Sequence, residues 1–174
     1  MYTIRPARPE DVPALAELGA RTFVETFVEG FGIPYPADDM ARFLEEAFSE
    51  AATSRSVNDP AKGWWVGVAE DGRILGFAEI GPVTLPHPEA EPTNGELKRL
   101  YIARQAQGLG LGRALLESAL DAMAERFSGP EWIGVWSGNL KAQKLYGHYG
   151  FAKAGEYQFP VGNWRDDEFI LRRG

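Results

Sequence analysis

Two stretches in the first third of the chain place apolar residues at helical spacing. One follows Pro9-Glu10-Asp11, where a proline and two acids stand together as they do at many helix starts. The other follows Asp38-Asp39. The stripe positions are Val12, Leu15, Leu18, Thr22, Phe23 and Phe27 in the first and Met40, Phe43, Leu44, Ala47 and Phe48 in the second. Both patterns predict amphipathic helices that pack one face on a core.

Beyond residue 63 the pattern changes to short extended runs that alternate with helices. The predicted strands are 2–5, 64–69, 74–80, 96–102, 132–136, 155–161 and 164–172, and the later helices are 110–127 and 139–150. An Asp-Gly turn joins the second and third runs into a hairpin, whereas the proline-containing stretch 81–94 predicts a surface loop. This order of elements predicts a single α/β domain, residues 1–174, with a mixed sheet.

Composition narrows the class of protein. The chain has 174 residues, 44% hydrophobic and 25% charged, which is typical of one globular domain. It has no cysteine, which excludes disulfides, thiolate metal sites and cysteine nucleophiles. We find no apolar run that could span a bilayer and no signal-peptide pattern, so we expect a soluble, cytoplasmic protein with no membrane partner.

The charge balance bears on the partner. The net charge is −7 and the sequence pI is about 4.9. Nucleic-acid binding draws on clustered lysine and arginine, so this acidity argues against a nucleic-acid partner. A cationic small molecule is favoured electrostatically. Solubility alone is an equally simple reason for an acidic surface.

A glycine-rich segment joins the strand ending at Ile102 to the helix that follows. Its residues are Gln107, Gly108, Leu109, Gly110, Leu111, Gly112 and Arg113. Glycine lets the backbone approach a ligand closely, and the free N–H groups of a helix N-terminus bind anions. Arg113 adds a cation in the first turn of the helix. The segment therefore predicts a phosphate-binding loop.

The two best-known phosphate loops differ from this one. No Gly-Lys-Ser/Thr follows the glycines, which excludes a Walker loop. The glycines alternate and come late in the chain, after a hairpin, unlike the G-x-G-x-x-G motif of an opening βαβ unit. A structural alternative stays open, because glycines at a strand-to-helix turn can also serve close packing alone.

A second motif follows the strand 132–136. Asn139 stands at the start of the predicted helix and is a good N-cap residue. The residues on one face of that helix are Ala142, Leu145, Tyr146 and Tyr149. Packing in a core explains Tyr149 and Phe151, whereas Tyr146 is a candidate for chemistry.

Together, the two motifs resemble those of the GNAT superfamily of N-acetyltransferases. The matching residues are Gln107-x-x-Gly110-x-Gly112, Asn139-x-x-Ala142-x-x-x-Tyr146 and Gly150-Phe151, in that order along most of the chain. The resemblance implies a central mixed, mostly antiparallel sheet flanked by helices and splayed to admit acetyl-CoA. It also implies transfer of the acetyl group to a primary amine, with no metal.

Four further segments resemble the bacterial spermidine/spermine acetyltransferase branch. They are Phe23–Phe27, Asp39–Ser49, Trp132–Trp136 and Phe159–Gly162. This resemblance implies a polyamine such as spermidine or spermine as the acceptor, which agrees with the acidic composition. A protein or peptide N-acetyltransferase and an acyl-CoA-binding sensor without turnover are the alternatives.

The resemblance also implies roles for individual residues. The pantetheine arm of acetyl-CoA pairs with the strand before the loop, here the backbones of Leu100, Tyr101 and Ile102. The pyrophosphate binds on the loop from Gln107 to Arg113, and Asn139 lies near the arm. A tyrosine at the position of Tyr146 donates a proton to the departing thiolate, although a thiol with a pKa of about 8.5 can also leave unaided.

The acceptor must also lose a proton, because an alkylamine with a pKa of about 10.4 is mostly protonated at neutral pH. Glu96 stands eleven positions before Gln107, as does the glutamate base of histone-type GNAT members, and is our candidate base. An exposed carboxylate at a strand end fits the same position, and Glu79 or a water relay are alternatives. The final hairpin, 155–172, offers an edge through which a homodimer can form.

Overall fold

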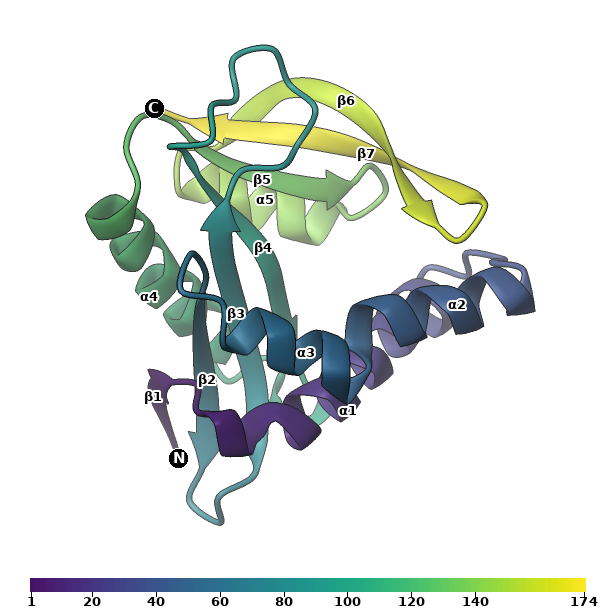
Figure 1. Cartoon of the computed structure of the whole chain (residues 1–174), viewed down its shortest axis with the longest axis vertical. Helices are drawn as coiled ribbons and strands as arrows, with labels where there is room; N and C mark the ends of the chain where they lie inside the picture. Colours follow the sequence, from purple (N-terminus) through teal and green to yellow (C-terminus); the bar gives the residue numbers. More distant parts are fainter.

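A seven-stranded sheet runs through the computed structural model, which describes residues 1–174 (Figure 1). The strands are β1 (Tyr2–Pro6), β2 (Gly63–Ala69), β3 (Ile74–Pro82), β4 (Gly95–Ile102), β5 (Glu131–Trp136), β6 (Ala152–Val161) and β7 (Trp164–Arg173). Their order in the sheet is β1-β2-β3-β4-β5-β7-β6, and only β4 and β5 are parallel. The predicted mixed, mostly antiparallel sheet is confirmed.

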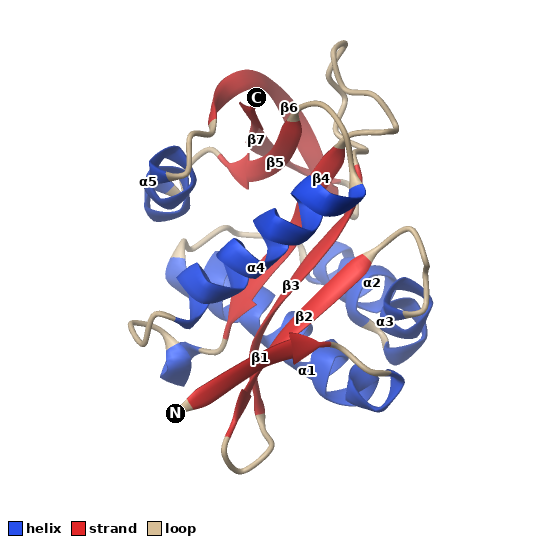
Figure 2. Cartoon of the chain, turned by 90° about the vertical axis from the view of Figure 1, so that its left-hand side faces the viewer, coloured by secondary structure: helices blue, strands red, loops and turns tan.

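Helices cover both faces of the sheet. They are α1 (Val12–Phe23), α2 (Ala37–Phe48), α3 (Glu50–Val57), α4 (Leu111–Arg126) and α5 (Leu140–His148). Helix α4 crosses one face, and α1, α2 and α3 lie on the opposite face (Figure 2). None of them combines the length and the apolar character that a bilayer crossing requires.

The first helical region differs from its prediction in two ways. Helix α1 continues into a π-helical segment, Val24–Gly30, which the apolar spacing does not predict. Helix α3 was also not predicted, because its short sequence lacks a strong apolar stripe. A local signal for it exists, since the Ser49 hydroxyl accepts a hydrogen bond from the Ala52 N–H at 3.2 Å and so caps the helix.

The main core lies between α4 and the sheet. Leu111, Leu115, Leu116 and Ala119 of α4 are fully buried there, and they pack with apolar residues of β2, β3 and β4. Because α4 begins at the glycine-rich segment, this packing also fixes where that segment lies. The core therefore holds one part of the candidate site in place.

Truncation of a core leucine should show how much this packing contributes. We expect Leu115→Ala to lower the free energy of unfolding by about 2–5 kcal/mol, because it leaves a cavity in a close-packed region. Leu109 is 61% exposed, so Leu109→Ala serves as the matched control and should change that free energy by less than about 0.5 kcal/mol. Denaturant unfolding of both variants measures the difference. Equal midpoints and slopes would contradict the assignment of this core.

The sheet opens between its two parallel strands. Pairing of β4 with β5 covers only three residue pairs, from Gly95 with Glu131 to Leu97 with Ile133. On the other side of β4, Glu79 of β3 pairs with Arg99 and the next residue pairs with Leu97, so Lys98 is an extra residue in a β-bulge. Beyond this bulge β4 has no partner on its β5 side. The gap therefore separates the part of the sheet formed by β1 to β4 from the part formed by β5, β7 and β6.

Candidate active site

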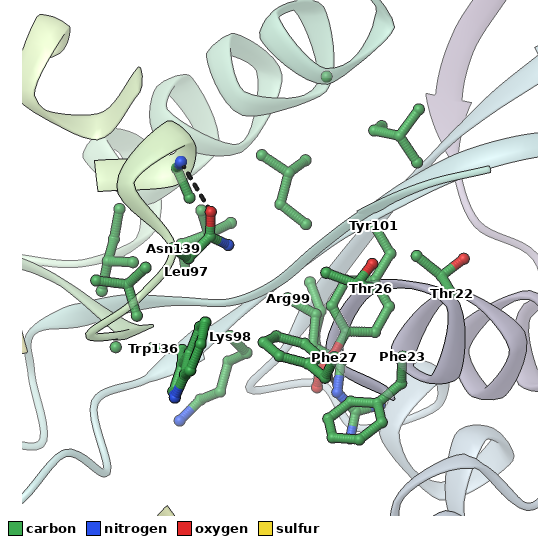
Figure 3. Close-up of a pocket in the computed structure, with 18 of the residues that line it drawn as sticks. Thr22, Phe23, Thr26, Phe27, Leu97, Lys98, Arg99, Tyr101, Trp136 and Asn139 are labelled. Carbon is green, nitrogen blue, oxygen red and sulfur yellow. Dashed lines mark hydrogen bonds and ion pairs between the residues drawn. The ribbon is translucent and has the colours of Figure 1, made fainter. Parts of the chain in front are cut away.

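A cavity of about 870 Å³ fills the space beside this gap (Figure 3). The residues from our sequence prediction that line it are Glu96, Leu100, Tyr101, Ile102, Gln107, Gly108, Gly110, Gly112, Arg113, Asn139 and Tyr146. Two predicted residues do not line it, since Leu109 is exposed and Leu111 is fully buried in the core. Their predicted contribution is a backbone N–H, which does not depend on where the side chain lies.

The glycine-rich loop has the geometry of an anion site. Gly108 and Gly110 have φ angles of +80° and +81°, a region that other residues rarely adopt. The first N–H that bonds within α4 is that of Ala114, which donates to the Gly110 carbonyl at 3.1 Å. The preceding N–H groups of the helix, from Leu111 to Arg113, therefore have no acceptor within it. Their donors and the positive end of the helix dipole suit a pyrophosphate.

Arg113 is held beside this loop. Its Nε donates to the Glu117 carboxylate at 3.0 Å, and the Tyr149 hydroxyl donates to the same oxygen at 2.7 Å. The hydrogen bond to Glu117 raises the pKa of Arg113. The guanidinium of Arg113 is therefore paired with a carboxylate of the next helical turn, and its terminal N–H groups make no hydrogen bond to the protein.

The unpaired stretch of β4 faces the start of α5 across the gap. Asn139 caps that helix, because its Oδ1 accepts a hydrogen bond from the Ala142 N–H at 3.1 Å (Figure 3). Its side-chain NH₂ makes no hydrogen bond to the protein and stays available to a ligand. An open strand edge followed by an anion-binding loop fits the extended arm and pyrophosphate of acetyl-CoA.

Tyr146 lies on the α5 side of the cavity. Its side chain is 9% exposed and its ring meets Phe151 edge to face, with ring centroids 6.4 Å apart. The hydroxyl has no hydrogen-bond partner in the protein. Burial raises the pKa of Tyr146, and the neighbouring Tyr101 raises it further. Tyr146 is therefore protonated at neutral pH and can donate a hydrogen bond into the cavity.

The two carboxylates considered as bases both have cationic partners. Glu96 is 7% exposed, and its Oε2 accepts from the Thr84 N–H and from Lys98 Nζ, each at 2.8 Å. Glu79 accepts from Ser56 at 2.7 Å and from Lys62 at 3.0 Å, and it also pairs with a nearby arginine. Both carboxylates are therefore already paired with cationic side chains.

Two further carboxylates of the cavity were missed by the sequence analysis. Asp166 and Glu168 lie on β7, and neither has a lysine, arginine or histidine within 4.0 Å. Asp166 accepts from the hydroxyl of Tyr35 at 2.5 Å and from Trp164 Nε1 at 2.9 Å. Alternation along the strand was the available signal, because residues 164, 166, 168 and 170 point to one face and Ile170 is buried.

Glu168 differs from the other acids in its proton affinity. Its Oε2 accepts a hydrogen bond from the Tyr157 hydroxyl at 2.6 Å. Burial raises the pKa of Glu168 to about 7, with the charges of Asp166 and Glu96 adding to the rise and the Tyr157 hydrogen bond opposing it. A carboxyl group in this range exchanges protons near neutral pH.

Aromatic rings from both sides of the gap line another part of the cavity. The rings are those of Phe23, Phe27, Phe31, Phe43, Phe48, Trp136 and Phe159. The rings of Phe27 and Trp136 meet edge to face with centroids 6.5 Å apart (Figure 3). Thr22, Thr26 and the carboxylates of β7 add polar groups to this part of the lining. No group of three or more histidine, cysteine, aspartate or glutamate side chains is arranged to hold a metal ion.

Comparisons with known proteins agree with this geometry. The model of the acetyltransferase (GNAT) family matches residues 20–151. An uncharacterised N-acetyltransferase from the pepI 3′ region of Lactobacillus delbrueckii subsp. lactis is 27% identical over 164 residues, covering 94% of this chain and 92% of that protein. The spermine/spermidine N(1)-acetyltransferase of Bacillus subtilis is 31% identical over 97 residues, covering 54% of this chain and 62% of that protein.

A solved structure extends the match to the whole fold. The PaiA N-acetyltransferase of Thermoplasma acidophilum, crystallised with coenzyme A, has a TM-score of 0.74 at 19% identity, covering 99% of this chain and 98% of that one. The family model spans most of the chain, and the loop and the open edge of β4 fit the co-substrate of that family. This chain therefore belongs to the GNAT family and is an acetyl-CoA-dependent N-acetyltransferase.

Proposed function

We propose that the acceptor is a primary amine that enters the cavity as a cation, and that polyamines such as spermidine and spermine are its class. The observation that carries this proposal is the pair of β7 carboxylates. Asp166 and Glu168 line the cavity without a cationic partner, whereas the other two acids already have one. A cationic acceptor would supply the missing positive charge.

The remaining wall suits the rest of such a molecule. Methylene chains between the amines of a polyamine are apolar and would pack on the phenylalanine and tryptophan rings. Those rings also attract ammonium groups through their faces. The partial match to the spermine/spermidine acetyltransferase of Bacillus subtilis points to the same class.

The predicted roles follow the two sides of the cavity. We assign binding of the pantetheine arm to the backbones of Leu100, Tyr101 and Ile102. The pyrophosphate would bind to the loop from Gln107 to Arg113, and Asn139 would lie near the arm. A backbone N–H of β4 would stabilise the negative charge that develops on the thioester oxygen. The Tyr146 hydroxyl would donate to the sulfur as the C–S bond breaks.

An acceptor panel tests the proposal. Purified protein is incubated with acetyl-CoA and, separately, with spermidine, spermine, free amino acids and peptides with different N-terminal residues, and release of free thiol is followed. We expect the polyamines to give the highest kcat/KM. The selectivity should fall as salt rises, because screening weakens the attraction of a cation to the β7 carboxylates.

The other outcomes of the panel are equally clear. Turnover of peptides with none on polyamines would contradict the polyamine class and leave the acetyltransferase in place. Tight binding of acetyl-CoA without turnover of any amine would point to an acyl-CoA sensor. Mass spectrometry of the spermidine product would show which nitrogen carries the acetyl group.

A further inference from the structure

We propose that Glu168, held by Tyr157 above Gly134, takes the proton from the ammonium group of the acceptor. The proposal rests on the proposed function, because it needs an amine that arrives protonated. It assigns a catalytic role to a residue of β7 that the sequence motifs do not include. Three strands meet at this point, since Glu168 pairs with Trp136 of β5 and with Tyr157 of β6.

Gly134 leaves the space that the pair occupies. A Cβ atom at this position would lie 2.7 Å from the Tyr157 hydroxyl and 3.3 Å from Glu168 Oε2. A separation of 2.7 Å is too short for a Cβ atom, so any other residue at position 134 would push the Tyr157 hydroxyl away. The hydroxyl and the carboxylate can therefore lie directly over the backbone of β5, one residue beyond its last pair with β4. This is the point at which the sheet opens into the cavity.

Glu168 also has an oxygen available for a ligand. Its hydrogen bond with Tyr157 uses Oε2, and Oε1 makes no hydrogen bond to the protein. Oε1 is not fully buried, and Glu168 lines the cavity, so this oxygen is accessible to a ligand there. Asp166, by contrast, uses both of its oxygens to accept from Tyr35 and Trp164.

Glu168 and Glu96 differ in the charged groups around them. The titratable groups that face Glu168 are Tyr157 on β6, Asp166 on β7, Glu96 and Tyr101 on β4, and Tyr35 before α2. Lys62, Lys98 and Arg99 also line the cavity, but they pair with Glu79 and Glu96. Glu96, by contrast, already has a cationic partner, because its Oε2 lies 2.8 Å from Lys98 Nζ. A base whose pKa lies near the working pH is the most effective, and that of Glu168 is about 7.

The acceptor enters as R–NH₃⁺, and one N–H proton moves to Glu168 Oε1, which leaves R–NH₂ with its lone pair free. The nitrogen then forms a bond to the carbonyl carbon of the thioester, and the C–S bond breaks. The second proton passes from the nitrogen to water in the cavity as the amide forms, and the thiolate takes a proton from Tyr146, which water then reprotonates, or directly from water. Glu168 returns its proton to solvent through the cavity.

The pH profile of Glu168→Gln is the central measurement. For the wild type, kcat/KM with spermidine should rise through pH 7, and at pH 6 it should be about a tenth of its plateau because only that fraction of Glu168 is ionised. The variant should lose about 100-fold in kcat/KM at pH 7 and lack this limb. Glu156 on β6 is exposed, so Glu156→Gln is the matched control and should keep the wild-type profile.

A second acceptor separates proton removal from binding. A fluorinated alkylamine that is already unprotonated at pH 7 needs no base, so Glu168→Gln and the wild type should acetylate it at nearly equal rates. A larger KM with unchanged kcat for spermidine would assign Glu168 to binding alone and overturn the proposal. A 100-fold loss in Glu96→Gln, with little change in Glu168→Gln, would also overturn it and assign the proton to Glu96.

Tyr157→Phe keeps the proposal testable if Glu168→Gln folds poorly. Loss of the hydroxyl removes the hydrogen bond that opposes the rise in the pKa of Glu168, so the acidic limb should move to higher pH. An unmoved limb in a folded variant would contradict the role of Glu168. If the wild type acetylates no amine at all, the proposed function itself fails, which the acceptor panel shows independently of these variants.

Discussion

Replacement of Tyr146 by phenylalanine is expected to lower kcat about 100-fold, the lower end of the range for general acid catalysis. The phenol stays protonated because burial raises the pKa of Tyr146, and its hydroxyl is free to donate to the leaving sulfur. The effect should not exceed this range by much, since a thiol with a pKa of about 8.5 is a reasonable leaving group by itself. Single-turnover measurements with acetyl-CoA and spermidine would isolate the chemical step.

Acetyl-CoA affinity should change little in Tyr146→Phe, because the ring and its packing on Phe151 are retained. Tyr149→Phe is the matched control. Tyr149 lies at the end of the same helix, but its hydroxyl donates to Glu117 on α4 and it does not line the cavity. An equal loss of rate in both variants, or none in Tyr146→Phe, would remove Tyr146 from the mechanism.

Gly110→Val is expected to weaken acetyl-CoA binding about 5- to 150-fold, which corresponds to roughly 1–3 kcal/mol. Gly110 has a φ of +81°, and a β-branched residue is strained in that region. The loop would therefore relax away from the conformation that presents the free N–H groups of α4. Isothermal titration with acetyl-CoA measures the change in Kd.

A second glycine provides the control for strain alone. Gly72 has a φ of +86° in the turn between β2 and β3, and a Cβ there would meet nothing within 4 Å. Gly72→Val introduces the same strain in a turn that does not line the cavity, so it should lower stability and leave the Kd for acetyl-CoA unchanged. Unchanged affinity in Gly110→Val would contradict the assignment of this loop to the pyrophosphate.

The loop and the helix cap that we assign to the co-substrate could be predicted as local structure, because their residues are close together in the chain. The loop from Gln107 to Arg113 would bind its ligand through backbone N–H groups, and the glycines that permit this can be read directly from the sequence. Asn139 is recognisable as a helix cap for the same reason. A motif that acts through local conformation is complete within a few residues.

The acceptor side could not be predicted in the same way. Tyr35 and Asp166 share a hydrogen bond although they are 131 positions apart, and Glu168 meets Tyr157 only because two strands pair. Alternation along β7 indicates which of its residues share a face, but not which element covers that face. The absence of a cationic side chain within 4.0 Å of Glu168 is likewise a property of the assembled cavity. Phe27 lies on the predicted helical stripe, but the spacing does not predict the π-helical form of the segment that carries it.

The opening between β4 and β5 has a consequence for how this site tolerates change. From Lys98 to Ile102 every second residue of the strand presents its N–H and C=O groups to the gap, because the residues between them bond to β3. Every amino acid except proline supplies both groups, so a ligand that pairs with this edge recognises the main chain and not the residue. Side chains along β4 can therefore diverge between relatives without loss of the contact, and proline is the one substitution that removes a donor from it.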